Sequence, residues 1–196
     1  NSAGVNVMDL EVASMPVSRF VTRSPRQIGG LSVRLAPGDP QSVVVRFLDN
    51  EGADITEDSQ RKIERLFQRE DYRRVFAAEI GDIGFLPRAT EDYAIALEST
   101  VEISAIADAR FKVVIDHAYG STSLVMPNVL AKLGADVLAV NPYTSTMGAI
   151  SFDHEAHADN VGNLVRASGA HVGAVIDPDG ERITLIDDEG HVLTDT

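Results

Sequence analysis

FKVVID, residues 111–116, is an apolar run without polar alternation, which is typical of a strand buried on both faces of a parallel sheet. The same pattern returns in DVLAV, residues 136–140, and in HVGAVID, residues 171–177. A helical segment precedes each of these two later runs, and the helices end at Gly134 and Gly169. The order strand, helix, strand, helix, strand predicts a doubly wound α/β sheet, parallel or mixed.

Acidic side chains follow two of these strands. Asp116 ends the first run and Asp177 ends the third, so both lie at the carboxyl edge of the predicted sheet, where ligands bind in such folds. Asp177 also opens a short loop that continues with Asp179, Glu181 and Arg182. Asp, Pro and Gly are also ordinary turn residues. The loop is therefore either a metal site or a polar hairpin turn.

The first half of the chain has a different pattern of apolar and polar residues. GGLSVRLAP, residues 29–37, and SVVVRFLDN, residues 42–50, read as two strands separated by a turn rich in Pro and Gly. A charged helix with a narrow apolar stripe is predicted after Thr56, which can cap it. These elements predict part of a second α/β domain.

A domain boundary is predicted at EIGDIGFLPRA, residues 79–89, because two glycines and a proline break the pattern there. The chain then divides into residues 1–88 and residues 89–196. A helix should begin at Thr90 and continue through Val101.

A long polar loop is predicted after the second buried strand, from Asn141 to about Ala158. It contains DHEAH, residues 153–157, whose two histidines are three positions apart. A zinc-binding helix needs them four apart with Glu next to the first. We therefore interpret this stretch as solvated surface. His117, after the strand end at Asp116, is interpreted as a hydrogen-bonded loop histidine.

Composition narrows the function classes. The chain has 196 residues, 44% of them apolar, and a net charge of −13, which disfavours nucleic acid and anionic membranes as partners. It has no cysteine, no apolar run long enough to span a bilayer and no signal peptide. A cytoplasmic, bacterial setting is predicted. The start Asn-Ser-Ala, without Met, indicates a cloning scar or an excised piece of a longer chain.

The chain resembles the α-D-phosphohexomutase family, the phosphomannomutase and phosphoglucomutase enzymes. VVIDHAYGSTSLVMPNVLAKLGADVLAVN, residues 113–141, is similar to the start of the family's second domain. NLVRASGAHVGAVIDPDGERITLIDDEGHVL, residues 163–193, resembles the stretch that carries the family's magnesium loop. The stretch from GVNVMDLEVASMPVSRFV to GADI, residues 4–55, resembles the later part of the first domain. By this resemblance, the early first domain and the third and fourth domains lie outside the chain.

The resemblance implies a hexose phosphate mutase, which moves a phosphoryl group between the 1- and 6-positions of a sugar. A phosphoserine donates the group, and magnesium is held by the carboxylates of an Asp-Gly-Asp-x-Asp-Arg loop. Carried over, Asp177, Asp179 and Glu181 are the metal ligands and Arg182 lies on the phosphate side. Phosphoryl transfer depends on positioning and charge neutralisation, and Mg²⁺ takes hard oxygen ligands. The implied cofactor is weakly bound Mg²⁺.

Two departures from the family pattern matter. The family's nucleophile lies in a Thr-Ala-Ser-His-Asn-Pro type loop, and here the serine's place falls at Ala36 or Pro37, neither of which has a hydroxyl. No catalytic residue is therefore assigned. In the metal loop, Glu181 replaces an aspartate and Pro178 replaces a glycine, which restricts the backbone.

Three hypotheses follow. The chain is a fragment of a sugar-phosphate mutase, inactive alone because the phosphoserine is missing. Alternatively it is a degenerate scaffold or regulatory module of a sugar-1-phosphate nucleotidyltransferase, such as mannose-1-phosphate guanylyltransferase. The third is a plain protein-interaction domain. The expected partners are a sugar phosphate in the full-length parent, the covalently linked domains, and a second copy joined through the open sheet edge of the first unit.

Overall fold

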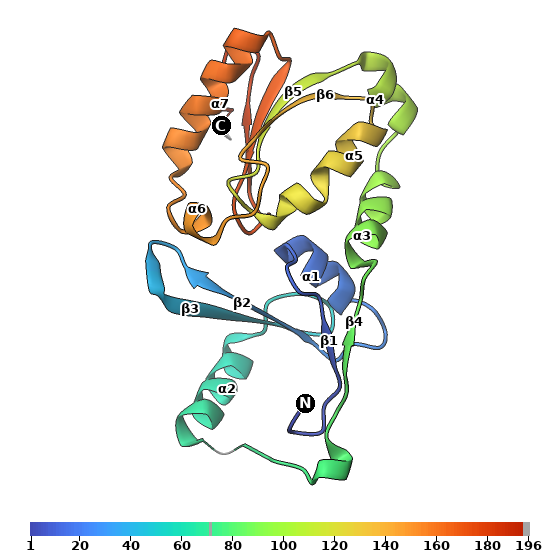
Figure 1. Cartoon of the computed structure of the whole chain (residues 1–196), viewed down its shortest axis with the longest axis vertical. Helices are drawn as coiled ribbons and strands as arrows, with labels where there is room; N and C mark the ends of the chain where they lie inside the picture. Colours follow the sequence, from blue (N-terminus) through green and yellow to red (C-terminus); the bar gives the residue numbers. More distant parts are fainter. Residues whose placement is uncertain (71, 194–196) are drawn as a thin grey trace.

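Two stacked units make up the chain in this computed structural model, which describes residues 1–70 and 72–193 (Figure 1). The elements of the first unit are β1 (Val7–Asp9), α1 (Met15–Thr22), β2 (Gly30–Ala36), β3 (Asp39–Leu48), α2 (Glu57–Arg69), the 3₁₀ turn η1 (Ala77–Glu79) and β4 (Ile83–Phe85). Those of the second unit are α3 (Ala89–Glu98), α4 (Ile103–Ala109), β5 (Lys112–Asp116), η2 (Ser121–Leu124), α5 (Met126–Lys132), β6 (Asp136–Val140), α6 (Thr146–Ile150), α7 (His154–Ser168), β7 (Val172–Ile176) and β8 (Ile183–Ile186).

The sheet of the second unit has the strand order β6-β5-β7-β8. β5 pairs in parallel with β6 and β7, and β8 is antiparallel to β7. Helix α7 covers one face and α5 lies on the other (Figure 1). Val114, Val161, Val165, Val175 and Ile186 are almost fully buried between α7 and the sheet. The predicted mixed, doubly wound sheet is confirmed.

The first unit contains two separate two-stranded sheets. β2 and β3 form an antiparallel hairpin, whereas β1 pairs in parallel with β4. β4 lies inside residues 79–89, which the sequence predicted as a boundary only. Glycine is needed beside this strand pair because the two backbones approach closely. A Cβ atom on Gly81 would lie 2.2 Å from the carbonyl oxygen of Val5. The division into residues 1–88 and 89–196 stays a prediction.

Helix limits differ from the predicted ones at two places. α3 ends at Glu98, so Val101 lies outside it, and the short helix α4 follows. The predicted long polar loop contains α6 and the first turn of α7. Asp153 caps α7 by accepting a hydrogen bond from the backbone N–H of Ala156 at 2.9 Å. His154 to His157 are therefore helical, so the predicted loop was wrong, whereas residues 153–156 are exposed as the interpretation of solvated surface expected.

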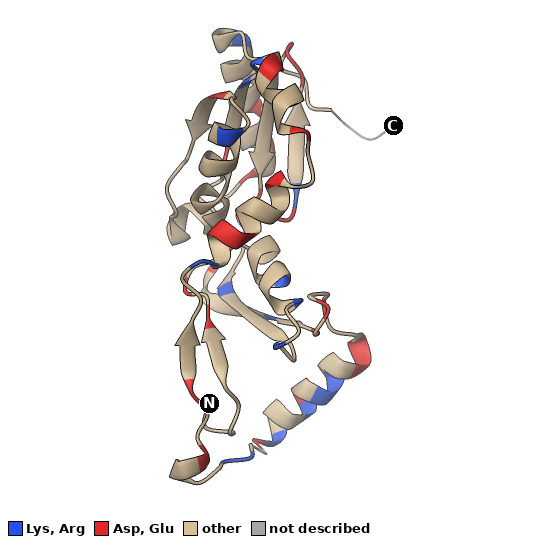
Figure 2. Ribbon diagram, turned by 90° about the vertical axis from the view of Figure 1, so that its right-hand side faces the viewer, with Lys and Arg blue, Asp and Glu red and all other residues tan. Residues whose placement is uncertain are grey.

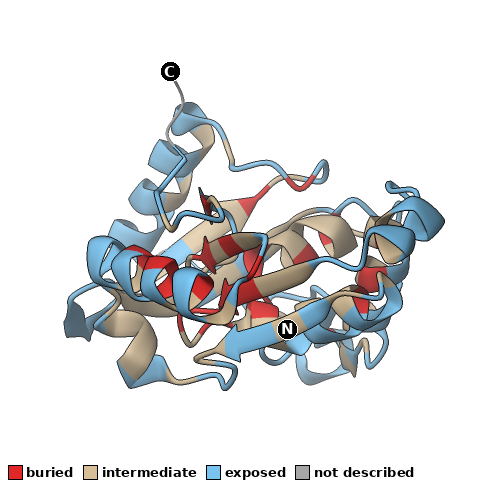
Figure 3. Cartoon of the chain, turned by 90° about the horizontal axis from the view of Figure 1, so that it is seen from above, coloured by how far each residue is buried: buried red, intermediate tan, exposed pale blue. Residues whose placement is uncertain are grey.

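Most buried hydrophobic residues among those described belong to the second unit. Figure 3 shows buried segments in the middle of the view with exposed segments around them. Among the described residues, the buried hydrophobics of the first unit are only Met15, Val17 and Leu48. Helix α2 buries none of its residues and exposes charges along its length (Figure 2). No helix in the described part of the chain is long and apolar enough to cross a bilayer.

Candidate functional site

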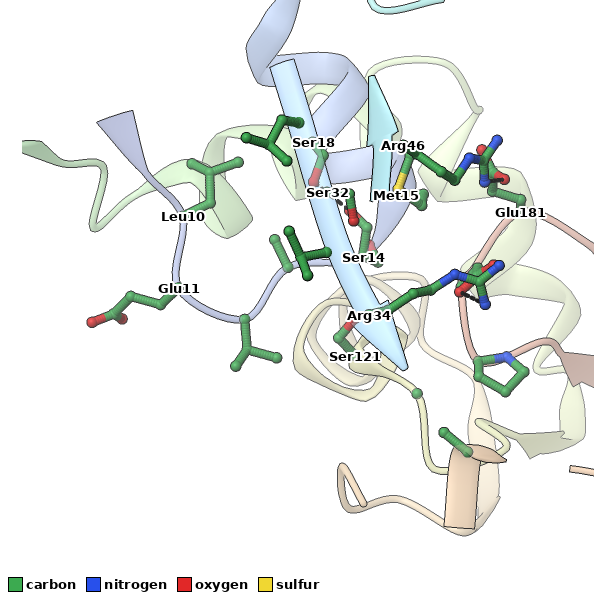
Figure 4. Close-up of a pocket in the computed structure, with 18 of the residues that line it drawn as sticks. Leu10, Glu11, Ser14, Met15, Ser18, Ser32, Arg34, Arg46, Ser121 and Glu181 are labelled. Carbon is green, nitrogen blue, oxygen red and sulfur yellow. Dashed lines mark hydrogen bonds and ion pairs between the residues drawn. The ribbon is translucent and has the colours of Figure 1, made fainter. Parts of the chain in front are cut away.

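A cleft of about 1140 Å³ lies where the two units meet. Its walls are the carboxyl edge of the second unit's sheet, the β2–β3 hairpin and the start of α1 (Figure 4). Hydroxyl side chains are frequent on these walls and include Ser14, Ser18, Ser32, Ser121 and Ser145. The acidic loop, defined as residues 177–182, enters this cleft between β7 and β8.

Asp177 closes the acidic loop on itself. Its Oδ1 atom accepts hydrogen bonds from the backbone N–H groups of Glu181 at 2.9 Å and Arg182 at 3.2 Å. The N–H of Gly180, which has φ of 79°, donates to the Asp177 carbonyl at 2.9 Å. Asp177 is thus the turn-forming residue of the loop, because its side chain accepts hydrogen bonds from backbone N–H groups further along the turn.

Asp179 pairs with the first unit. Its Oδ1 atom lies 2.9 Å from a terminal guanidinium nitrogen of Arg34, and its side chain is 18% exposed. Burial raises the pKa of Asp179 above the usual value, and the attraction of Arg34 only partly opposes this. The backbone carbonyl of Asp179 also accepts a hydrogen bond from the N–H of Met15 at 3.0 Å, which fastens the loop to the start of α1.

Glu181 has two arginine partners. Its Oε1 atom accepts a hydrogen bond from Arg19 at 2.7 Å, and its Oε2 atom accepts one from Arg46 at 2.5 Å. Figure 4 shows Arg46 beside Glu181. Asp54 bridges the same two arginines at 2.9 Å and 3.0 Å. Burial alone would raise the pKa of Glu181, but the hydrogen bonds from Arg46 and Arg19 outweigh it and lower the pKa. The same balance lowers the pKa of Asp54.

Arg182 takes no part in this network of ion pairs. Its side chain is exposed, and within the described residues no acidic side chain pairs with it. It also borders a smaller cavity of about 610 Å³, lined with Phe152, His154 and Thr184. There, Nε2 of His154 lies 2.6 Å from the hydroxyl oxygen of Thr184.

The acidic loop does not offer the ligand set that magnesium requires. Within residues 1–70 and 72–193, no three Asp, Glu or His side chains gather in a group able to hold a metal ion. Asp179 and Glu181 face guanidinium groups, and Oδ1 of Asp177 accepts from the backbone N–H groups of Glu181 and Arg182. Three carboxylates that point to different partners leave no shared position at magnesium's bond length of about 2.1 Å. The residues present therefore do not fit the ion.

The hairpin tip takes the place that the family resemblance gives to the nucleophile. Ala36 ends β2, and Pro37 and Gly38 form the turn into β3. The N–H of Gly38 donates to the Ile150 carbonyl of α6 at 3.2 Å, which holds the tip against the second unit. No side chain of this turn has a hydroxyl.

A second polar group lies behind the cleft, at the end of β5. Asp116 is fully buried and accepts hydrogen bonds from the N–H of Ala118, Nδ2 of Asn141 and Nδ1 of His157, at 2.8–2.9 Å. His117 is also buried, with its Nδ1 atom 3.4 Å from the Thr122 hydroxyl. Burial lowers the pKa of His117. This group joins β5 to α7 and to the end of β6.

Sequence reasoning missed the three arginines that face the acidic loop, Arg19, Arg34 and Arg46. A signal existed in the strands: Arg34 and Arg46 each interrupt an otherwise apolar run, VRLAP and VVVRFL. A single cation in an apolar strand needs a partner, because an unpaired charge at a partly buried position is costly. Its partner could not be identified from spacing, since Arg46 and Glu181 are 135 positions apart.

The fold and the cleft define this chain as a pair of α/β units that meet at an acidic loop on the carboxyl edge of a doubly wound sheet. Comparison with protein families identifies both units. The family model of phosphoglucomutase/phosphomannomutase alpha/beta/alpha domain I matches residues 1–74, and that of domain II matches residues 91–190. The chain belongs to the phosphoglucomutase/phosphomannomutase family, as the sequence predicted.

Individual relatives agree with this assignment. A phosphoglucomutase/phosphomannomutase of Thermococcus kodakarensis is 27% identical over 194 residues, which cover 98% of this chain and 42% of that protein. A phosphoglucosamine mutase of Dictyoglomus thermophilum is 29% identical over 197 residues, with the same two coverages. The chain thus spans about two fifths of the relatives it matches.

Solved structures show the same fold. A phosphoglucomutase/phosphomannomutase family protein from Burkholderia thailandensis superposes with a TM-score of 0.81 at 18% identity, covering 97% of this chain and 42% of that one. A putative phosphomannomutase from Thermus thermophilus gives a TM-score of 0.77 at 18% identity, covering 97% of this chain and 44% of that one.

Proposed function

We propose that this chain is a mutase-like region that does not transfer phosphoryl groups and that serves as a binding or scaffolding module within a longer protein. The observation that carries the proposal is the hairpin tip. By the family resemblance, the place of the nucleophilic serine falls at Ala36 or Pro37, and neither side chain can accept a phosphoryl group.

The cleft supports a retained binding role. Many of its wall residues bear hydroxyls, which suit a polyhydroxylated sugar, and Arg182 is an exposed cation at its rim. A sugar phosphate is the ligand class that we propose for the whole protein. The sequence-based alternative, attachment to a sugar-1-phosphate nucleotidyltransferase such as mannose-1-phosphate guanylyltransferase, is compatible with this role and stays a prediction, as does a cytoplasmic location.

A phosphoryl-transfer assay tests the proposal. The chain and any longer protein that contains it are incubated with glucose 1-phosphate or mannose 1-phosphate and the matching hexose bisphosphate. We expect no turnover in a coupled assay and no covalent phosphate by intact-protein mass spectrometry. The Ala36→Ser variant of the same proteins serves as the matched comparison. Turnover or a phosphorylated side chain in the unmodified protein would overturn the proposal.

A further inference from the structure

We propose that the acidic loop is a metal-independent clamp between the two units, in which arginine side chains replace the magnesium ion that the family resemblance implies. The clamp consists of Arg19, Arg34 and Arg46 from the first unit and Asp179 and Glu181 from the loop. The family resemblance implies a magnesium ion at this loop, whereas the carboxylates of Asp179 and Glu181 pair with arginines. This difference points to the new role.

Each guanidinium group of the clamp has a carboxylate partner without a metal ion, although Nε of Arg34 is buried without a hydrogen-bond partner. The three guanidinium groups are matched by three carboxylates, those of Asp54, Asp179 and Glu181, at separations of 2.5–3.0 Å. Oδ1 of Asp177 is engaged by the backbone N–H groups of Glu181 and Arg182. A divalent ion among these carboxylates would lie close to guanidinium groups of like charge, and this repulsion opposes its binding. Displacing the arginines would leave them partly buried and unpaired.

Each arginine comes from a different element. Arg19 belongs to α1, Arg34 to β2 and Arg46 to β3, and all three pair with one loop of the other unit. Figure 4 shows Arg34 and Arg46 extending from the hairpin toward this loop. Contacts from three elements restrict rotation as well as separation. The clamp therefore restrains how the units are oriented, together with the buried contact of Val17 with Ala94, Val125 and Val129.

The first unit holds two of the arginines in place by itself. Asp54 pairs with both Arg19 and Arg46, and the carbonyl oxygen of Gly52 accepts a further hydrogen bond from Arg19 at 2.9 Å. The backbone there must approach closely, since a Cβ atom on Gly52 would lie 2.5 Å from the Arg19 carbonyl oxygen. Because Arg19 and Arg46 are already held in place, they lose less conformational entropy when they pair with Glu181.

Metal titration gives the first test. The melting temperature of the chain is followed as MgCl₂ or MnCl₂ is added, with NaCl at matched ionic strength as the reference. We expect equal shifts for the divalent and monovalent salts. A saturable rise with Mg²⁺ or Mn²⁺ that Asp177→Asn together with Asp179→Asn abolishes would overturn the proposal.

The second test measures orientation rather than turnover, so its failure is distinct from that of the proposed function. The chain has no cysteine, so Gln41→Cys and Asp188→Cys can carry a spin-label pair across the two units. We expect one narrow distance in the absence of metal and loss of that narrow distance in Glu181→Gln. Glu57→Gln, which removes the exposed ion pair with Arg61 inside α2, is the matched control and should leave the distance unchanged.

A cooperative melting transition in Glu181→Gln establishes that the variant is folded before its distances are compared. An unchanged narrow distance in the folded variant would show that the clamp does not set the orientation, and would overturn the proposal. If Glu181→Gln does not fold, Arg46→Gln removes the same contact from the other side and is judged by the same outcome.

Discussion

The Nδ1 atom of His157 lies 2.8 Å from Oδ2 of Asp116, a carboxylate with no exposed surface. The pair connects the end of β5 to helix α7, and Asn141 adds the end of β6 through a hydrogen bond to the other oxygen at 2.9 Å. Three elements of the second unit are therefore tied together at one side chain, just behind the cleft.

Asp116→Ala should destabilise the chain by about 3 kcal/mol, because it leaves His157 and Asn141 without their buried acceptor. The melting temperature should fall by roughly 6–12 °C for a chain of this size. Asp136→Ala, at the exposed start of β6, is the control and should change stability by less than about 0.5 kcal/mol. Equal losses in the two variants would contradict this account.

Gly120→Ala should loosen the contact between the β5–α5 turn and the acidic loop. A Cβ atom at residue 120 would lie 2.6 Å from the carbonyl oxygen of Pro178, a backbone atom that cannot move aside without shifting the loop. We expect a loss of about 1–3 kcal/mol in chemical denaturation. Gly84→Ala is the comparison, since its Cβ would meet only the flexible side chain of Met8 at 3.1 Å. The idea fails if Gly84→Ala is the more damaging change.

His117 should make stability depend on pH. Burial lowers its pKa in the folded chain below the ordinary value of 6.5, against the attraction of the neighbouring Asp116 carboxylate. The unfolded chain therefore takes up this proton first as pH falls. The stabilisation is complete above about pH 6.5 and declines below it. His117→Gln should flatten the curve of unfolding free energy against pH in this window, measured by urea unfolding. An unaltered slope would show that other groups cause the decline.

Substitutions in the β2–β3 hairpin can test the homodimer that the sequence predicts. Leu31, Val33, Val43 and Val45 lie exposed on one face of this two-stranded sheet, whose edges are open to pairing. If copies associate there, Val33→Glu should abolish a concentration-dependent dimer in sedimentation velocity. Ser42→Glu, on an exposed position of the same hairpin, is the control. A strict monomer at high concentration would contradict the dimer.

The second unit was largely predictable because its signals are local. Buried parallel strands appear as continuous apolar runs, as in FKVVID and HVGAVID, and Gly169 marks the end of α7 with φ of 63°. The start of α7 was missed because Asp153 and the two histidines after it are polar. Polarity alone does not distinguish a capped helix from a loop.

The remaining features depend on residues far apart in the sequence. β4 has only three residues, and its pairing with β1 is invisible to periodicity. The acidic loop was correctly located at the edge of the sheet, and the position of Asp177 after β7 followed from topology. The arginine partners of Asp179 and Glu181 could not be predicted from topology, because complementary charges on distant strands leave no periodic pattern in the sequence.

The parallel pairing of β1 with β4 has a consequence for the order in which the chain folds. Val7 pairs with Ile83, so this contact closes a loop of roughly 75 residues, whereas the β2–β3 hairpin joins neighbouring segments. Non-local pairings form more slowly than local ones. During synthesis the hairpin can form early, but the first unit stays incomplete until Phe85 has emerged. Since β4 leads almost directly into α3, the step that completes the first unit also positions the start of the second.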